Sequence, residues 1–268
     1  MFTPASTDHA VTAASFQVIL SASMPPSLIT RLQASHDQFQ TELPALNVGK
    51  TVTIEITPQG PVINELPGTA FSFLRPDGTP AWSLRVSGNE IAVDCNRYTR
   101  WAAVSEQANA LIRRVFELFI AWGHGDLEVA GVALTVRDDF YWHDELEAYD
   151  LKRLLMSSDV LVERSFVTGP VWHSHAAWFE DRNAGVSTLV HLNVDGVEVD
   201  PSPNNRGAHA QVAITNFQNV RYNQPMQITW HGANFNDTVV SGMENMHIRN
   251  KSLLKKLLIP TVASSIGL

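Results

Sequence analysis

The chain has 268 residues and a formal net charge of −8, with 44% hydrophobic and 17% charged residues. This length suits one large domain or two modest ones, and the composition is that of an ordinary globular protein. Surfaces that bind nucleic acids need an excess of Lys and Arg, so the acidic balance argues against a nucleic acid as the main ligand. A basic protein partner is compatible with it.

The sequence also bears on compartment. No apolar run approaches the roughly 20 residues that span a membrane, and the first residues lack the basic and apolar regions of a signal peptide. Cys95 is the single cysteine, so no intrachain disulfide can form. It lies in a strand-like run, where a buried thiol is usually inert. We therefore expect a cytoplasmic protein.

The first part of the chain predicts a strand, a helix and a second strand. Residues 1–14 are polar and small, which indicates a loose end. An apolar strand follows at 16–23, and Pro25-Pro26-Ser27 begins a helix that Pro44 ends. Alternating apolar residues at 51–56 predict the next strand.

Residues 71–122 contain the clearest pattern. Apolar side chains alternate with polar or small ones through three runs, at Phe71, Phe73, Trp82, Leu84, Val86, Ile91 and Val93. The short turns between these runs, 75–78 and 87–89, predict an antiparallel meander. The spacing then changes to that of one helical stripe, at Leu111, Val115, Leu118, Phe119 and Trp122, and Gly123 stands where a C-cap glycine would.

The rest of the chain is mostly strand. Asp144 can cap a short helix, and further strands are predicted at 129–141, 171–179, 186–194, 210–215 and 226–230. A helix from about 250 to 258 closes the chain before Pro260. Helices beside antiparallel strands define an α+β fold, with antiparallel sheets packed against a few helices. The elements divide into two lobes, 1–160 and 161–268, which could be similar to each other or could form one compact domain.

Several segments resemble a sporadically distributed bacterial family of uncharacterised proteins of about this length. The similarity lies in the opening strand 16–20, in 81–86, in the entry to the long helix at Tyr98 and Trp101, and in the C-terminal leucines at 253, 254, 257 and 258. The strand after the long helix lacks the Arg-Tyr-Ile-Asn sequence usual in that family. The resemblance brings no catalytic residues with it. It implies an accessory role in bacteria, in a defence or toxin–antitoxin setting.

Three histidines form the one candidate metal site. His173 and His175 are two residues apart and share a face of their predicted strand, and His191 lies on the next strand. If Asp181-Arg182-Asn183 forms a three-residue loop, His191 stands directly opposite His173, whereas a four-residue loop places it on the other face. Three imidazoles on one face could bind Zn²⁺. The simpler alternative is a set of partly exposed histidines without metal.

These observations leave three hypotheses. The first is a non-catalytic binding or regulatory protein with a protein partner and no cofactor, which predicts an exposed apolar patch. The second is a metal-dependent hydrolase that uses His173, His175 and His191 with zinc. The third is a structural subunit of a larger assembly, in which an open sheet edge or the C-terminal helix forms the contact. The absence of a reaction motif favours the first.

Overall fold

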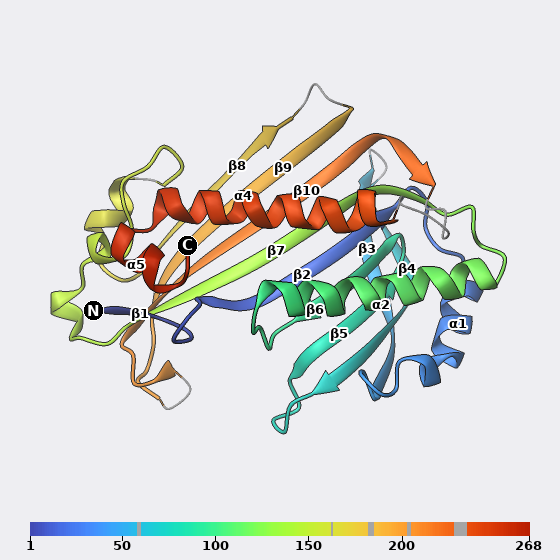
Figure 1. Ribbon diagram of the computed structural model, residues 1–268, viewed down its shortest axis with the longest axis horizontal. Helices are drawn as coiled ribbons and strands as arrows, with labels where there is room; N and C mark the ends of the chain where they lie inside the picture. Colours follow the sequence, from blue (N-terminus) through green and yellow to red (C-terminus); the bar gives the residue numbers. More distant parts are fainter. Residues whose placement is uncertain (58–59, 162, 182–184, 203–204, 228–234) are drawn as a thin grey trace. The chain divides into compact units, whose positions relative to one another are not determined.

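The computed structural model describes residues 1–57, 60–161, 163–181, 185–202, 205–227 and 235–268. In this part of the chain the strands form one ten-stranded antiparallel sheet accompanied by helices, which confirms the α+β class (Figure 1). The strands are β1 (Phe2–Pro4), β2 (Val11–Leu20), β3 (Ala45–Thr57), β4 (Gly60–Leu74), β5 (Pro80–Ser87), β6 (Glu90–Cys95), β7 (Glu128–Trp142), β8 (Trp172–Glu180), β9 (Val186–Glu198) and β10 (Ala210–Gln227). The strand order is β3-β4-β5-β6-β2-β7-β10-β9-β8, and β1 pairs with β7.

The chain divides into two compact units that interleave along the sequence. Unit 1 comprises residues 1–14, 134–219 and 244–268, and unit 2 comprises 15–133 and 220–243. The division expected at residue 160 gives two lobes that are each continuous in the sequence, whereas each of these units is built from separate segments. The independent folding of the two lobes stays a prediction.

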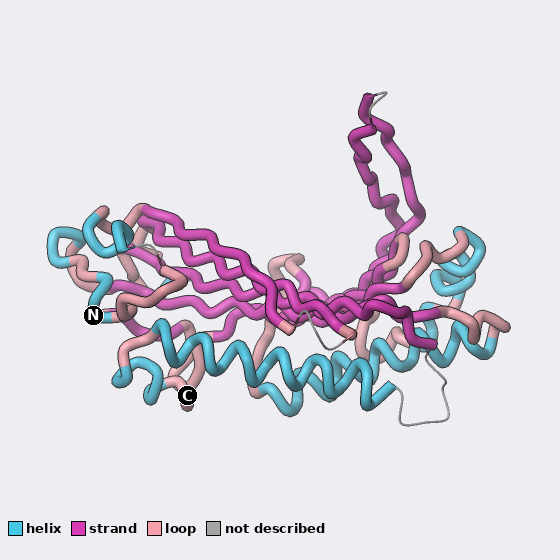
Figure 2. Tube along the Cα trace, turned by 90° about the horizontal axis from the view of Figure 1, so that it is seen from above, coloured by secondary structure: helices cyan, strands magenta, loops and turns pink. Residues whose placement is uncertain are grey.

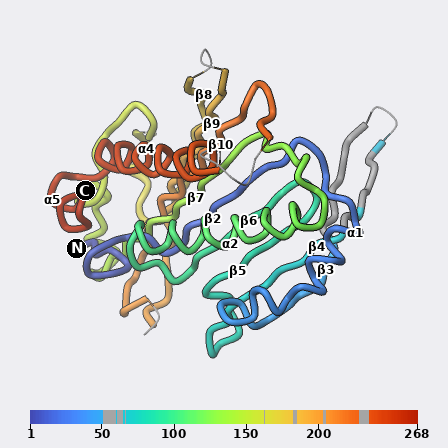
Figure 3. The backbone as a smooth tube through the Cα atoms, turned by 45° about the vertical axis from the view of Figure 1, so that its right-hand side comes forward, coloured from blue at the N-terminus to red at the C-terminus, as the bar shows by residue number. Residues whose placement is uncertain are grey.

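Unit 2 contains the predicted meander. Strands β4, β5 and β6 pair antiparallel, and Leu84 stands opposite both Phe71 and Val93. Gly78 has a φ of +83° in the first turn, a left-handed conformation that glycine adopts without steric cost. Helix α1 (Pro26–Ala34) lies next to β4 (Figure 3), and the Phe39 ring stacks on Phe71 with 4.8 Å between ring centroids.

The long helix α2 (Trp101–Ala121) packs against β6, and its buried positions include Leu111, Val115 and Phe119, as predicted. It ends in a Schellman motif: the amide of Gly123 donates to the Ile120 carbonyl oxygen, and the amide of His124 donates to that of Phe119. Gly123 has a φ of +89°, so it fills the C-cap role that the sequence indicated.

Strands β3 and β4 extend beyond the other strands of unit 2. Their pairing continues from Ala45↔Ser72 to Thr57↔Gly60, whereas β4 pairs with β5 only from Gly68 to Leu74. Gly49 and Gly68 are cross-strand partners at the point where the third strand ends. Figure 2 shows the remainder of this hairpin as a two-stranded arm that projects away from β5 and β6.

Unit 1 has its own core beneath helix α4 (Ser241–Leu257) and the short helix α5 (Pro260–Ser265). Strands β7, β9 and β10 contribute apolar side chains from alternating positions, and α4 contributes Leu254 and Leu257. Trp142 is fully buried and its indole nitrogen donates to the Glu145 carbonyl oxygen.

Several expectations about the elements were wrong. Residues 1–14 are not a loose end, because they form β1 and the start of β2. The helix expected to reach Pro44 ends at Ala34, and a 3₁₀ turn (His36–Gln38) follows. Asp144 caps no helix, and two 3₁₀ turns, Leu146–Ala148 and Leu151–Arg153, take the place of the expected one. The last strand expected, 226–230, falls partly outside the described residues.

Candidate functional site

The three histidines lie on neighbouring strands but in a different register from the one expected. His173 stands opposite Asp195 and His191 stands opposite Ala177. Direct pairing of His173 with His191 was therefore wrong. The paired residues nearest the turn are Glu180 and Thr188, so seven residues connect them, where a three-residue loop, 181–183, was expected. Residues 182–184 lie outside the described part of the chain. The register still places all three histidines on one face.

The contacts of these histidines do not form a cluster of three. The rings of His173 and His175 are 5.3 Å apart between centroids, and His175 Nε2 lies 3.1 Å from Asp195 Oδ1. His191 instead contacts the Phe217 ring edge to face, at 5.6 Å. No three His, Cys, Asp or Glu side chains in the described segments are placed to hold a metal ion. The zinc site stays a prediction without support from this geometry.

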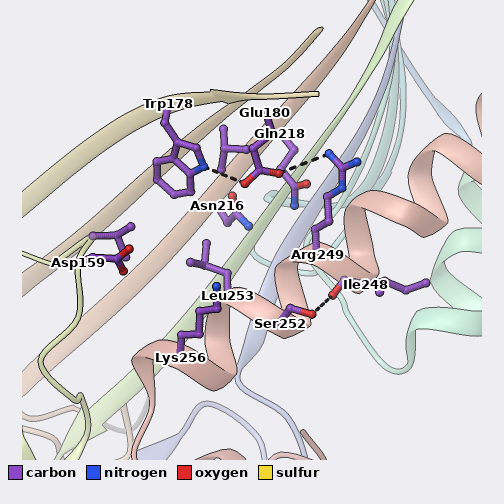
Figure 4. A pocket seen from close by; sticks show the side chains of 12 residues that line it. Asp159, Trp178, Glu180, Asn216, Gln218, Ile248, Arg249, Ser252, Leu253 and Lys256 are labelled. Atoms are coloured by element: carbon purple, nitrogen blue, oxygen red, sulfur yellow. Dashed lines mark hydrogen bonds and ion pairs between the residues drawn. The ribbon is translucent and has the colours of Figure 1, made fainter. Parts of the chain in front are cut away.

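A cavity of about 320 Å³ lies between α4 and the helix-facing side of β8, β9 and β10 (Figure 4). Its size is at the lower end of the range for small-molecule sites. The apolar part of its wall consists of Trp178, Val190, Leu253, Ile248 and Val160. All the lining residues belong to unit 1.

Two amides from β10 form the most deeply buried polar part of the wall. Asn216 and Gln218 are each 2% exposed. Gln218 Nε2 donates to the Met246 carbonyl oxygen and Asn216 Nδ2 donates to Asn250 Oδ1, each at 2.8 Å. The side-chain oxygens of Asn216 and Gln218 accept no hydrogen bond from the described residues. Leaving such an oxygen without a donor costs about 1–3 kcal/mol.

Arg249 joins α4 to the end of β8 at the rim. It forms ion pairs with Glu180, at 3.6 Å, and with Asp181, and its guanidinium also donates to Thr188 Oγ1. Glu180 in turn accepts a hydrogen bond from Trp178 Nε1 at 2.9 Å. Figure 4 shows the side chains of Trp178, Glu180 and Arg249 connected in this order. Both rim carboxylates near Arg249 are therefore ion-paired, and the three groups together keep one negative charge.

The remaining charges of the lining are more exposed. Asp159 and Lys256 line the cavity, and neither forms an ion pair with another described residue. Ser252 has its hydroxyl engaged, because it donates to the Ile248 carbonyl oxygen. None of the described lining residues is a histidine or a cysteine.

Cys95 lies elsewhere, in unit 2, and is fully buried. Burial raises the pKa of its thiol to about 11, so almost none of it is thiolate at neutral pH. The expected burial of this thiol is confirmed, and its raised pKa disfavours a nucleophilic role.

The cavity was not predicted from the sequence, although the sequence contains one signal of it. The strand predicted at 210–215 continues to Gln227, and its core-facing positions run Ala210, Val212, Ile214, Asn216 and Gln218. Alternate residues of a strand lie on the same face, so a change from apolar to amide side chains at alternate positions marks a polar section of a buried face. The predicted strand ended one residue before that change.

Searches for relatives found no protein-family model and no curated protein that matches this chain. None of the helices in the described segments is long and apolar enough to cross a membrane.

Proposed function

We propose that this protein is a non-catalytic binding protein whose small-molecule site is the cavity between α4 and β8–β10. The observation that carries the proposal is the pair of buried, incompletely hydrogen-bonded amides of Asn216 and Gln218 beside the apolar part of the wall. A few placed polar groups in an apolar cavity are typical of ligand sites.

The lining favours binding over catalysis. Amides do not transfer protons at neutral pH, and the carboxylate of Glu180 is engaged by Arg249 and Trp178. The other lining carboxylate, Asp159, is exposed to solvent. The Ser252 hydroxyl donates to the backbone carbonyl oxygen of Ile248 and not to a basic side chain. A nucleophile needs an adjacent base or a lowered pKa to react.

A second surface supports a protein partner. The first hypothesis predicted an exposed apolar patch, and Leu46, Val48 and Phe73 of β3 and β4 are 39%, 61% and 41% exposed. Exposed apolar groups close together often mark protein contacts. We include a protein partner in the proposal, together with the bacterial defence setting that the family resemblance implies. If ligand binding in the cavity changes the affinity for the protein partner, the protein is a regulatory one.

The test of the proposal is the indole N–H signal of Trp178 in a ¹H–¹⁵N spectrum, assigned with Trp178→Phe. We expect a set of small aromatic fragments to include some that shift this signal in the wild type. Ser252→Phe places a ring in the cavity and should abolish the shifts, because Ser252 lines it. Lys255→Phe is the matched control, since Lys255 is exposed on the same helix and does not line the cavity.

The proposal fails if no fragment moves the Trp178 signal, or if Ser252→Phe responds as the wild type does. The metal-dependent alternative has a separate test, since His173 and His175 do not line the cavity. Stoichiometric zinc in the purified protein that is lost from His173→Ala/His175→Ala would favour the hydrolase. Equal and near-zero metal in both proteins would reject it.

A further inference from the structure

The orientation of the Gln218 amide is determined by its neighbour. A backbone carbonyl oxygen only accepts hydrogen bonds, so the Gln218 group that lies 2.8 Å from the Met246 oxygen must be the NH₂ group. The other end of the amide, Oε1, is therefore an acceptor, and no described residue donates to it. Asn216 Oδ1 also accepts no hydrogen bond from a described residue, two residues earlier on the same face of β10. Its assignment as the oxygen follows from Asn250 Oδ1 being the acceptor in the hydrogen bond between the two asparagines.

The charge of the surroundings restricts what can donate to these oxygens. A cationic amine would lose its hydration beside the amides, where Glu180 and Asp181 are both paired with Arg249. Asp159, the lining carboxylate without an ion pair to a described residue, is exposed and lies apart from the two amides in Figure 4. A carboxylate ligand would present lone pairs to the lone pairs of the two amide oxygens. A neutral N–H donor meets neither cost.

The apolar side chains supply the other half of the recognition. The Trp178 ring, Val190 and Leu253 line the same cavity as the amides (Figure 4). Val190 is 3% exposed, so the apolar wall reaches the same depth as Asn216 and Gln218. An aromatic or compact aliphatic group would bury its surface there, at roughly 25 cal/mol per Å².

We infer that the ligand is a small neutral molecule with an apolar body and a primary amide or similar N–H donor, which binds Gln218 Oε1 and Asn216 Oδ1. This inference rests on the proposed function, because it names the ligand class of the same cavity.

Benzamide and acetophenone are suitable probes, since they have nearly the same shape and differ in an NH₂ group against a CH₃ group. We expect benzamide to bind the wild-type protein about five- to tenfold more tightly, the effect of one or two net hydrogen bonds. Titration of the Trp178 indole signal gives both dissociation constants. Gln218→Met, which keeps the side-chain length without the carbonyl, should reduce the preference to about twofold or less.

The possible results separate the two proposals. If acetophenone binds as tightly as benzamide, water or another group satisfies the amide oxygens, and the ligand class is wrong while the cavity remains a binding site. A preference for benzamide that persists in Gln218→Met also contradicts the inference. If neither probe shifts Trp178 and no other fragment does, the proposed function fails as well. Should Gln218→Met not fold, the wild-type ratio of the two constants decides the matter.

Discussion

At the scale of single residues, the core of unit 1 contains a carboxyl group that is costly to ionise. Asp138 on β7 is 1% exposed, and its Oδ1 has no hydrogen-bond partner among the described residues. Burial, and then the negative charge of Asp139, raise the pKa of Asp138 to about 7. Asp139, by contrast, accepts hydrogen bonds from Arg137 Nε at 3.0 Å and from the Thr12 hydroxyl at 2.6 Å.

Asp138 should therefore make stability fall as the pH rises. Its pKa in the unfolded chain is about 3.9, so between about pH 4 and 7 the unfolded state loses a proton that the folded state keeps. We expect Asp138→Asn to remove this fall and to raise the free energy of unfolding at pH 8 by roughly 2–4 kcal/mol. Urea unfolding from pH 4.5 to 8 measures it. Asp159→Asn, at an exposed position, is the control. An unchanged pH slope in Asp138→Asn would contradict the assignment.

At the scale of elements, local sequence determined the meander and the long helix. The turn residues around Gly78 and the Schellman motif at Gly123 act within a few positions of the chain, so their signals are local. The pairing of β8 with β9 was not predictable in the same way. The turn between them is too long to dictate a register, so the pairing depends on which side chains the core accepts.

One glycine in β7 is required by the approach of β10. A Cβ atom at Gly131 would lie 2.4 Å from the Val220 carbonyl oxygen, which is backbone and cannot rotate away. We expect Gly131→Ala to destabilise the protein by about 1–3 kcal/mol. Gly125→Ala is the matched control, because the nearest atom to its Cβ would be 3.7 Å away, at ordinary van der Waals distance. Equal melting temperatures for the two variants would show that the strands separate more easily than this geometry implies.

At the scale of the whole molecule, the two units are joined within regular elements and not through linkers. The chain passes between them near residues 14, 133, 219 and 243, which lie inside β2, β7, β10 and α4. Domain boundaries normally fall in exposed loops with few contacts across them. Sequence composition reveals linkers of that kind, so it could not reveal this division.

This arrangement predicts that fragments cut at residue 160 do not fold alone. The fragment 1–160 lacks β8, β9, β10 and α4, so the core positions Phe140 and Trp142 lose the side chains that cover them. We expect each of the fragments 1–160 and 161–268 to lack a cooperative thermal transition in circular dichroism. Coexpression of the two should restore the transition. Independent cooperative unfolding of either fragment would support the sequential lobes instead.

The sequence by itself determined the fold class, the meander, the long helix and the burial of Cys95, because alternation, helical spacing and turn residues act over a few positions. Strand parity also placed His173 and His175 on one face, whereas the face of His191 depended on the loop length and was decided by the structure. The tertiary structure decided that His173 pairs with Asp195 and not with His191. It also brings Asn216 of β10 into a hydrogen bond with Asn250 of α4, which is 34 positions later in the chain. Such contacts depend on the joint packing of distant segments, in which one register is selected by the sum of many weak interactions. The cavity is of this kind, since its lining comes from β8, β9, β10 and α4 together.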